Sequence, residues 1–191
     1  MTEVRIHPTA FVSPEAKIGE GTSIWHNAQV RERALIGRNC ILGKDVYVDF
    51  EVTIGDNCKL QNGVYLYHPA ELADGVFLGP GVIVTNDKHP RAVNKDMTIK
   101  TAEDWLASPV TIGEGAAVGA GSVLLPGIHL GRWVMVGAGS VVTRDVPDYG
   151  LVVGNPAELI GYICKCGHRL NGESGNEFVC PTCGEIYQIK E

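Results

Sequence analysis

The sequence predicts an all-β solenoid, a coil of short parallel strands, because a six-residue repeat coincides with abundant glycine and few aromatic residues. Glycine accounts for 24 of the 191 residues, whereas aromatic side chains make up 7% of the chain. Such a composition is typical of many tight turns around a core of modest side chains. In chains of this kind the internal period decides the fold.

The repeat runs through most of the chain. Every sixth residue is aliphatic over 6–84 and again over 112–142, and the fourth residue after each is small or β-branched, with a clear exception at Lys88. A period of six fits neither a helix nor plain alternation, but it fits short strands joined by Gly or Asn corners. Three such strands make a coil of 18 residues, and we expect about seven coils with Cys40 and Cys58 in the core. Residues 18 apart should stack at the spacing of neighbouring strands, about 4.8 Å.

The chain divides into a solenoid domain over 1–160 and a short tail over 161–191. A loop over 86–111 interrupts the coil. A loop of this length inside a compact domain is usually functional, although a solvated flap is the alternative. It is rich in polar, cationic and aromatic side chains, among them Asn86, His89 and Trp105.

The hexapeptide VGAGSV occurs twice, at 118–123 and 136–141, one coil apart. Ala120 should therefore stack on Ala138, and a further step of 18 leads to Pro156. Small outward side chains would let a thin ligand, such as the pantetheine arm of coenzyme A, lie against the backbone. Corner glycines alone are a weak signal, because corners need glycine for conformational reasons.

Together, four features resemble the left-handed parallel β-helix (hexapeptide repeat) acyltransferases over about residues 6–160. They are the coil, the loop opened by TNDKHPR, the VGAGSV pair and the closing DVPDYGLVVGNPAELIG. The chain is most similar to nucleotide-linked amino-sugar N-acetyltransferases, which acetylate the 3-amino group of a UDP- or dTDP-sugar for surface polysaccharides such as lipopolysaccharide. The resemblance implies a homotrimer, acetyl-CoA as the donor and an active site in the cleft between neighbouring coils. It implies donor contacts at Gly119, Ala120, Ala138 and Pro156.

For the reaction itself we expect Asn86 and His89 to act, Asn86 by holding the amine or sugar and His89 by assisting proton transfer. The UDP-amino-hexuronate acetyltransferases tend to have Asn where this chain has His89. The His-Pro pair is similar instead to galactoside and maltose O-acetyltransferases, in which a histidine is the general base. An alcohol needs such a base, worth about 10²–10⁴-fold, more than an amine does. N-acetyl transfer and O-acetyl transfer with His89 as base therefore both stay open.

Four further residues are candidates for substrate binding. Arg91 and Lys95 suit a nucleotide pyrophosphate through charge-assisted hydrogen bonds, with surface ion pairs as the alternative. His68 is either an outward corner residue or a rival of His89. Gln61 opens the stretch QNGVYLYHPAELADG, which follows the spacing of the family on the substrate side.

Two other classes of function are alternatives on this fold. A γ-class carbonic anhydrase would need two histidines five residues apart, and the six histidines of this chain include no such pair. A non-catalytic trimeric scaffold is compatible with the coil, because a fold does not define a function. The loop and the VGAGSV pair argue against the scaffold.

Four of the six cysteines lie in the tail, in the motifs CKCG and CPTCG. This pattern resembles a zinc ribbon and predicts a structural Zn²⁺ bound by Cys164, Cys166, Cys180 and Cys183. Two disulfides are the alternative, disfavoured in a reducing compartment, and His168 is a spare ligand. Four thiolates close the coordination shell, so the metal would not be catalytic.

Charge and hydropathy exclude other partners. The chain has 16 Lys and Arg against 22 Asp and Glu, a net charge of −6, which gives no general attraction to nucleic acid. No apolar run reaches the length of a membrane span, and the N-terminus lacks the pattern of a secretory signal. We expect a cytoplasmic protein without membrane insertion.

Overall fold

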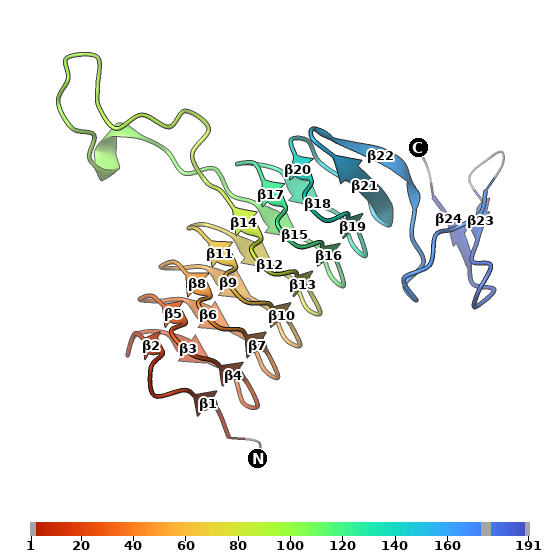
Figure 1. Cartoon of the computed structure of the whole chain (residues 1–191), viewed down its shortest axis with the longest axis horizontal. Helices are drawn as coiled ribbons and strands as arrows, with labels where there is room; N and C mark the ends of the chain where they lie inside the picture. Colours follow the sequence, from red (N-terminus) through yellow and green to blue (C-terminus); the bar gives the residue numbers. More distant parts are fainter. Residues whose placement is uncertain (1–2, 173–176, 190–191) are drawn as a thin grey trace.

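The computed structural model describes residues 3–172 and 177–189 and confirms the predicted β-solenoid (Figure 1). Two-residue strands alternate among three parallel sheets, here called sheets 1, 2 and 3 in the order in which the chain visits them. Sheet 1 contains β1 (Arg5–Ile6), β4 (Ser23–Ile24), β7 (Ile41–Leu42), β10 (Lys59–Leu60), β13 (Phe77–Leu78), β16 (Ala117–Val118), β19 (Met135–Val136), β21 (Gly150–Gly154) and the antiparallel β22 (Ala157–Tyr162).

Sheet 2 contains β2 (Phe11–Val12), β5 (Gln29–Val30), β8 (Tyr47–Val48), β11 (Tyr65–Leu66), β14 (Ile83–Val84), β17 (Val123–Leu124) and β20 (Val141–Val142). Sheet 3 contains β3 (Lys17–Ile18), β6 (Leu35–Ile36), β9 (Thr53–Ile54), β12 (Glu71–Leu72), β15 (Thr111–Ile112) and β18 (His129–Leu130). We call the turns between them the 1–2, 2–3 and 3–1 corners.

Up to β19 the register is the predicted step of 18, as in the pairing of Ile24 with Leu42, except across the loop, where Phe77 pairs with Ala117 at a step of 40. Parallel strands of sheet 1 stand at eight levels, from β1 to β21, which gives about eight turns where the period suggested about seven. The last step is shorter, because Val136 pairs with Val152, 16 residues later. The prediction that Pro156 continues the column above Ala138 is therefore wrong, and the hairpin turn between β21 and β22 contains Pro156.

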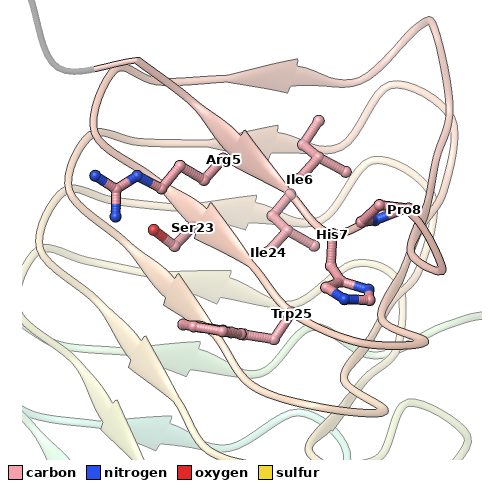
Figure 2. Close-up of a pocket in the computed structure, with 7 residues that line it drawn as sticks. All are labelled: Arg5, Ile6, His7, Pro8, Ser23, Ile24 and Trp25. Carbon is pink, nitrogen blue, oxygen red and sulfur yellow. The ribbon is translucent and has the colours of Figure 1, made fainter.

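The core is the stack of inward residues that the repeat predicts. Leu42 and Leu60 are fully buried, and so are the small partners Ala34 and Cys58. The first coil has no coil beneath it, so Ile6 remains 46% exposed. It lines a shallow hollow between β1 and β4 at this end of the solenoid (Figure 2).

The predicted loop leaves the solenoid after β14 and returns at β15, and Figure 1 shows it projecting away from the coils. It contains a short 3₁₀ helix, η1 (Ala102–Asp104). The amide of Ser108 donates a 2.8 Å hydrogen bond to the carbonyl of Asn86 and closes the base of the loop. Val110, 1% exposed, takes the inward position that Lys88 could not fill, which explains the break in the repeat.

The tail follows β22 and contains a hairpin of β23 (Glu177–Val179) and β24 (Ile186–Gln188). Its small core consists of Tyr162, Cys164, Leu170, Cys180, Tyr187 and Ile189. Within the described residues, no helix has the length and apolar character needed to span a bilayer.

Candidate functional site

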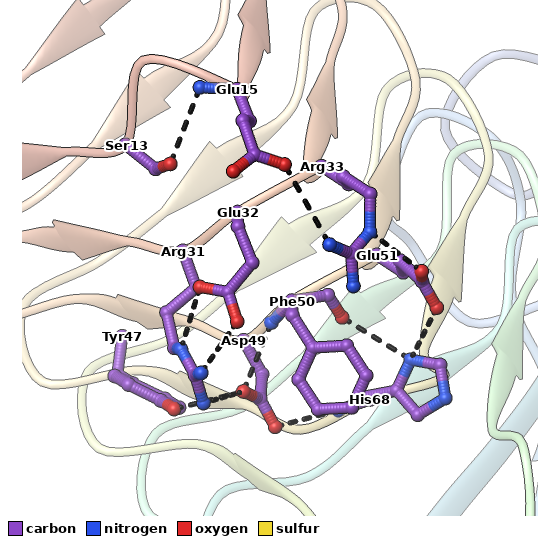
Figure 3. Close-up of polar contacts among 10 residues, drawn as sticks. All are labelled: Ser13, Glu15, Arg31, Glu32, Arg33, Tyr47, Asp49, Phe50, Glu51 and His68. Atoms are coloured by element: carbon purple, nitrogen blue, oxygen red, sulfur yellow. Dashed lines mark hydrogen bonds and ion pairs between the residues drawn. The ribbon is translucent and has the colours of Figure 1, made fainter.

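The 2–3 corner carries a connected set of polar side chains on successive coils (Figure 3). Asp49, only 6% exposed, accepts hydrogen bonds from the Arg31 guanidinium at 3.1 Å and the Tyr47 hydroxyl at 2.9 Å. Arg31 also forms an ion pair of 2.6 Å with Glu32. Burial raises the pKa of Tyr47, so its hydroxyl keeps its proton and donates. The polar side chains of this corner therefore bond to one another within the chain itself.

His68 lies one coil above this group. Its backbone N–H donates to Asp49 Oδ2 at 3.2 Å, and its ring stacks on Phe50 with centroids 4.2 Å apart and an interplanar angle of 13°. Its Nδ1 lies 3.2 Å from the carbonyl oxygen of Phe50 (Figure 3). A carbonyl only accepts, so we assign a proton to Nδ1; in the neutral imidazole the lone pair then lies on Nε2.

Asn86 stands one coil above His68. Its Nδ2 donates a 2.6 Å hydrogen bond to the carbonyl of His68. A hollow of about 440 Å³ opens here, and loop residues such as Trp105 and Leu106 form its far wall. The structure therefore brings two predicted residues, His68 and Asn86, together in one site.

His89 lies in an adjoining hollow of about 470 Å³, which shares Trp105 and Leu106 with the first. The side chain is exposed, and its backbone N–H donates to Asp87 Oδ1 at 2.8 Å. Arg91 and Lys95 are also exposed on the loop and line neither hollow. Gln61 lies at the 1–2 corner instead, in a hollow that also borders Lys44.

Sequence reasoning missed Asp49 and Phe50. Both could have been found from the period, since a step of 18 back from Tyr67 leads to Asp49 and from His68 to Phe50. Phe50 acts through its main-chain carbonyl and Asp49 through a buried carboxylate, and neither role can be recognised from a residue pattern.

The 1–2 corner forms the narrow column that the VGAGSV pair predicts. Ala120 and Ala138 are exposed. A Cβ added at Gly119 would lie 2.4 Å from the backbone nitrogen of Ala138, and one at Gly137 would lie 2.7 Å from Val153 Cγ1. Glycine is therefore needed at positions 119 and 137 for the coils to stack. Because Ala120 and Ala138 have small side chains, a ligand could approach the backbone beside them. Pro156 is exposed in the hairpin turn beyond Val153.

The outer face of sheet 2 lies between these two corners and is largely apolar. Of its seven outward residues, only Gln29 is polar without an aromatic ring. The other six are aromatic or aliphatic: Phe11, Tyr47, Tyr65, Ile83, Val123 and Val141. The outward residues of sheets 1 and 3 include charged groups such as Lys59 and Glu71.

The four tail cysteines converge as predicted. Their Sγ atoms all lie within 4.8 Å of one another. The Cys164–Cys183 and Cys166–Cys180 pairs are each 3.5 Å apart, and all four are free thiols. The backbone N–H of Cys183 is the main cause that lowers the pKa of Cys180 to about 6. His168 Nδ1 lies 3.5 Å from Cys166 Sγ and outside the four-sulfur set.

These features define a class. The chain matches the family described as bacterial transferase hexapeptide (six repeats) over residues 15–49, 51–86 and 109–144, which is more than half of its length. It also matches the hexapeptide repeat of succinyl-transferase over residues 33–68. The chain therefore belongs to the hexapeptide-repeat transferases.

Individual relatives narrow the comparison. A dTDP-3-amino-3,6-dideoxy-alpha-D-galactopyranose 3-N-acetyltransferase from Aneurinibacillus thermoaerophilus is 49% identical over 78 residues, which cover 41% of this chain and 40% of the relative. The bifunctional protein GlmU from a Synechococcus species is 38% identical over 76% of this chain and 29% of its own. The crystal structure of PerB from Caulobacter crescentus, in complex with CoA and GDP-perosamine, is similar with a TM-score of 0.51 and 28% identity. That alignment covers 84% of this chain and 58% of PerB, so this chain matches only part of each relative's length.

Proposed function

We propose that this protein transfers an acetyl group from acetyl-CoA to an amino group, at C3, of a nucleotide-linked sugar that is destined for a surface polysaccharide such as lipopolysaccharide. Support comes from the 49% identical relative, whose name specifies a dTDP-3-amino sugar, and from the PerB complex with CoA and GDP-perosamine. The observation within this chain that carries the proposal is the paired site of His68 and Asn86 beneath the loop.

The donor is proposed to lie along the 1–2 corner, against Gly119, Ala120 and Ala138, with Pro156 near its far end. The exposure of both alanines and the close backbone approach of their glycine neighbours support this. An extended pantetheine arm can hydrogen-bond to backbone amides and carbonyls. It therefore needs a surface where small side chains leave the backbone accessible.

The acceptor is proposed to lie at the 2–3 corner. The Asn86 amide is already fixed by its bond to the His68 carbonyl, so its Oδ1 suits an N–H of the acceptor amine. The amine nitrogen attacks the thioester carbonyl carbon, the C–S bond breaks, and a proton passes from nitrogen towards the departing thiolate. His68 Nε2 is better prepared to carry that proton than the exposed His89, because the Phe50 carbonyl orients its ring.

The two corners lie at opposite edges of sheet 2. Within one copy of the chain, the proposed donor site and acceptor site are therefore separated by the width of that sheet. We propose a homotrimer in which the apolar face of sheet 2 is buried between copies, because exposed apolar faces of this kind mark interaction sites. A three-fold axis parallel to the axis of the solenoid would bring the 1–2 corner of one copy against the 2–3 corner of the next.

Other substrate contacts are proposed from the neighbouring copy and from the loop. Gln61 and His68 lie in the same coil, so they are at the same height along the solenoid, which suits substrate binding by Gln61 from a neighbouring copy. Arg91 and Lys95 on the loop remain candidates for the nucleotide phosphates.

Sugar O-acetylation is the second candidate. A histidine with an oriented ring suits deprotonation of an alcohol, and a galactoside O-acetyltransferase from Lactococcus lactis is 37% identical over 42% of this chain. Zinc in the tail would take no part in either reaction, because four thiolates would fill its coordination shell.

The test is thiol release from acetyl-CoA with a panel of acceptors. We expect turnover with UDP-, dTDP- or GDP-linked amino sugars and little with galactosides or maltose. The reverse preference would move the protein to O-acetylation, and no turnover with any acceptor would favour a scaffold.

A further inference from the structure

We infer that the tail cysteines hold one structural Zn²⁺, and that this metal fastens the tail to the last coil of the solenoid. Tyr187 links the metal site to the fastening contacts, because its hydroxyl lies 3.3 Å from Cys164 Sγ and its ring packs against the last coil. This inference concerns the tail alone and goes beyond the proposed acetyl transfer.

The sulfur geometry fits a tetrahedral metal. A Zn–S bond of about 2.3 Å in a tetrahedron places sulfur atoms about 3.8 Å apart. The observed 3.5 Å for Cys164–Cys183 and for Cys166–Cys180 is close to that value, and far above the roughly 2.05 Å of a disulfide. Two members of the set, Cys164 and Cys180, are 1% exposed, so the sulfur cluster is anchored in the small tail core. Soft thiolates in a closed set of four favour zinc over Mg²⁺ or Ca²⁺.

The tail needs such a metal to be ordered. Among the described tail residues, the buried cluster around the two cysteines contains four other side chains, Tyr162, Leu170, Tyr187 and Ile189. Segments of about 30 residues rarely bury enough apolar surface to fold without a disulfide or a metal. All four thiols are free, so a metal is the remaining cross-link among the described tail residues.

Tyr187 connects the sulfur cluster to the solenoid. Its ring packs edge-on against Tyr149 of the last coil, with centroids 4.9 Å apart. The backbone N–H of Lys165 donates to its hydroxyl at 3.1 Å, and the Lys165 ammonium lies 5.6 Å from the ring centroid of Trp133. The N–H of Ile163 donates to the Tyr149 carbonyl at 2.7 Å. Through these contacts the tail packs against the 3–1 corner at the end of the solenoid.

The fastening extends to β22, which runs directly into Cys164. β22 pairs with β21, and Val153 of β21 lies over Gly137 in the second VGAGSV. A loaded metal site therefore holds in place the hairpin that closes the upper end of the 1–2 column. Loss of the metal should release this hairpin first and leave the lower coils intact.

The experiment uses the full chain. We expect about one zinc per chain by elemental analysis, and cobalt substitution should produce the thiolate charge-transfer and ligand-field absorption of a tetrahedral four-sulfur site. Cys183→Ser should lose most of the zinc, whereas His168→Ala, a neighbour outside the set, should keep it. Cys40→Ala, in the solenoid core, is a second control and should also keep the metal.

Amide hydrogen exchange then tests the fastening. Removing zinc with a chelator should speed exchange at residues 157–170 and at Ile163 in particular, with little change in coils over 24–84. Tyr187→Phe should retain zinc and show a partial increase in exchange over the same segment. Zinc-free protein with oxidised thiols would overturn the metal site. Zinc that can be removed without any change in exchange over 157–170 would overturn the fastening while leaving the metal site. Neither result depends on acetyl transfer.

Discussion

The side-chain amide of Asn86 donates a 2.6 Å hydrogen bond to the main-chain carbonyl of His68, one coil below it. His68 is held in turn by Phe50, through ring stacking and through the bond between Nδ1 and the Phe50 carbonyl. Three successive coils therefore build one preorganised corner, and each supplies a different part: a platform, an oriented imidazole and a fixed amide. Because these groups are already in place, no free energy has to be spent on reorganising them during the reaction.

Bulk in the donor column should weaken acetyl-CoA binding. Ala120→Phe or Ala138→Phe is expected to raise the KM for acetyl-CoA by roughly tenfold or more, about 1.4 kcal/mol, and to leave the thermal midpoint nearly unchanged because both side chains are exposed. Steady-state kinetics with acetyl-CoA as the varied substrate measures this. Glu114→Phe is the matched control, since Glu114 occupies the same place in a G-x-G corner of the same coil at the 3–1 corner. Equal KM values in all three folded variants would place the donor on another face.

Charge on the outer face of sheet 2 should break the oligomer. Tyr65→Lys is expected to shift the protein from trimer to monomer in sedimentation or light scattering, because a lysine would be buried between copies without a partner. Phe77→Lys is the control, since Phe77 is 39% exposed on sheet 1 and Tyr65 is 40% exposed on sheet 2. A trimeric Tyr65→Lys variant beside a dissociated Phe77→Lys variant would assign the interface to sheet 1.

If donor and acceptor corners come from different copies, two defective variants should complement each other. His68→Ala mixed and reassembled with Ala138→Phe is expected to regain part of the activity at limiting acetyl-CoA, because some sites then combine two intact corners. Activity no greater than the mean of the separate variants would contradict a site shared between copies.

A pH-dependent contribution to stability is expected from the 3–1 corner. Asp56 accepts hydrogen bonds from the Arg38 guanidinium at 2.6 and 3.0 Å and from the Arg38 backbone N–H at 2.7 Å, and these bonds lower the pKa of Asp56. A lowered pKa stabilises the fold above the unfolded value of about 3.9, and the contribution is lost as the pH falls through the folded value. Asp56→Asn should therefore reduce the thermal midpoint at pH 7.

The measurement is the midpoint of wild type and Asp56→Asn over a range of pH. The difference between them should shrink as the pH falls below about 4. A difference that stays constant down to the acid limit would show that the Asp56 charge contributes nothing. Asp87→Asn, on the loop, provides a carboxylate control away from Arg38.

The fold was predictable because each coil obeys the same local rule. An inward aliphatic residue, a small partner and a corner residue recur without help from distant sequence, and Lys88 marked the departure of the loop correctly. The last coil escaped prediction because the corner after β20 is two residues short. Val142 still pairs with Leu124 at a step of 18, whereas Val146 pairs with Leu130 at a step of 16, and β21 keeps the shorter step.

The site was less predictable than the fold. The sequence predicts Asn86 and His68 as candidates, but their association depends on a side-chain bond to a main-chain carbonyl, which residue identity does not reveal. The resemblance to the O-acetyltransferases favours His89 over His68, and the orientation of the His68 ring is evident only from its contacts with Phe50. The tail cysteines were predictable because four thiols in short motifs have few other uses.

The most direct test of the proposed chemistry is the kcat for an aminated nucleotide sugar in Asn86→Ala, His68→Ala and His89→Ala, measured side by side by thiol release. We expect His68→Ala to lose roughly 10²-fold or more in kcat. Asn86→Ala should cost at least as much as His89→Ala, whose loss should be modest. A near-wild-type Asn86→Ala enzyme beside an inactive His89→Ala enzyme would contradict this account and make the loop histidine the base.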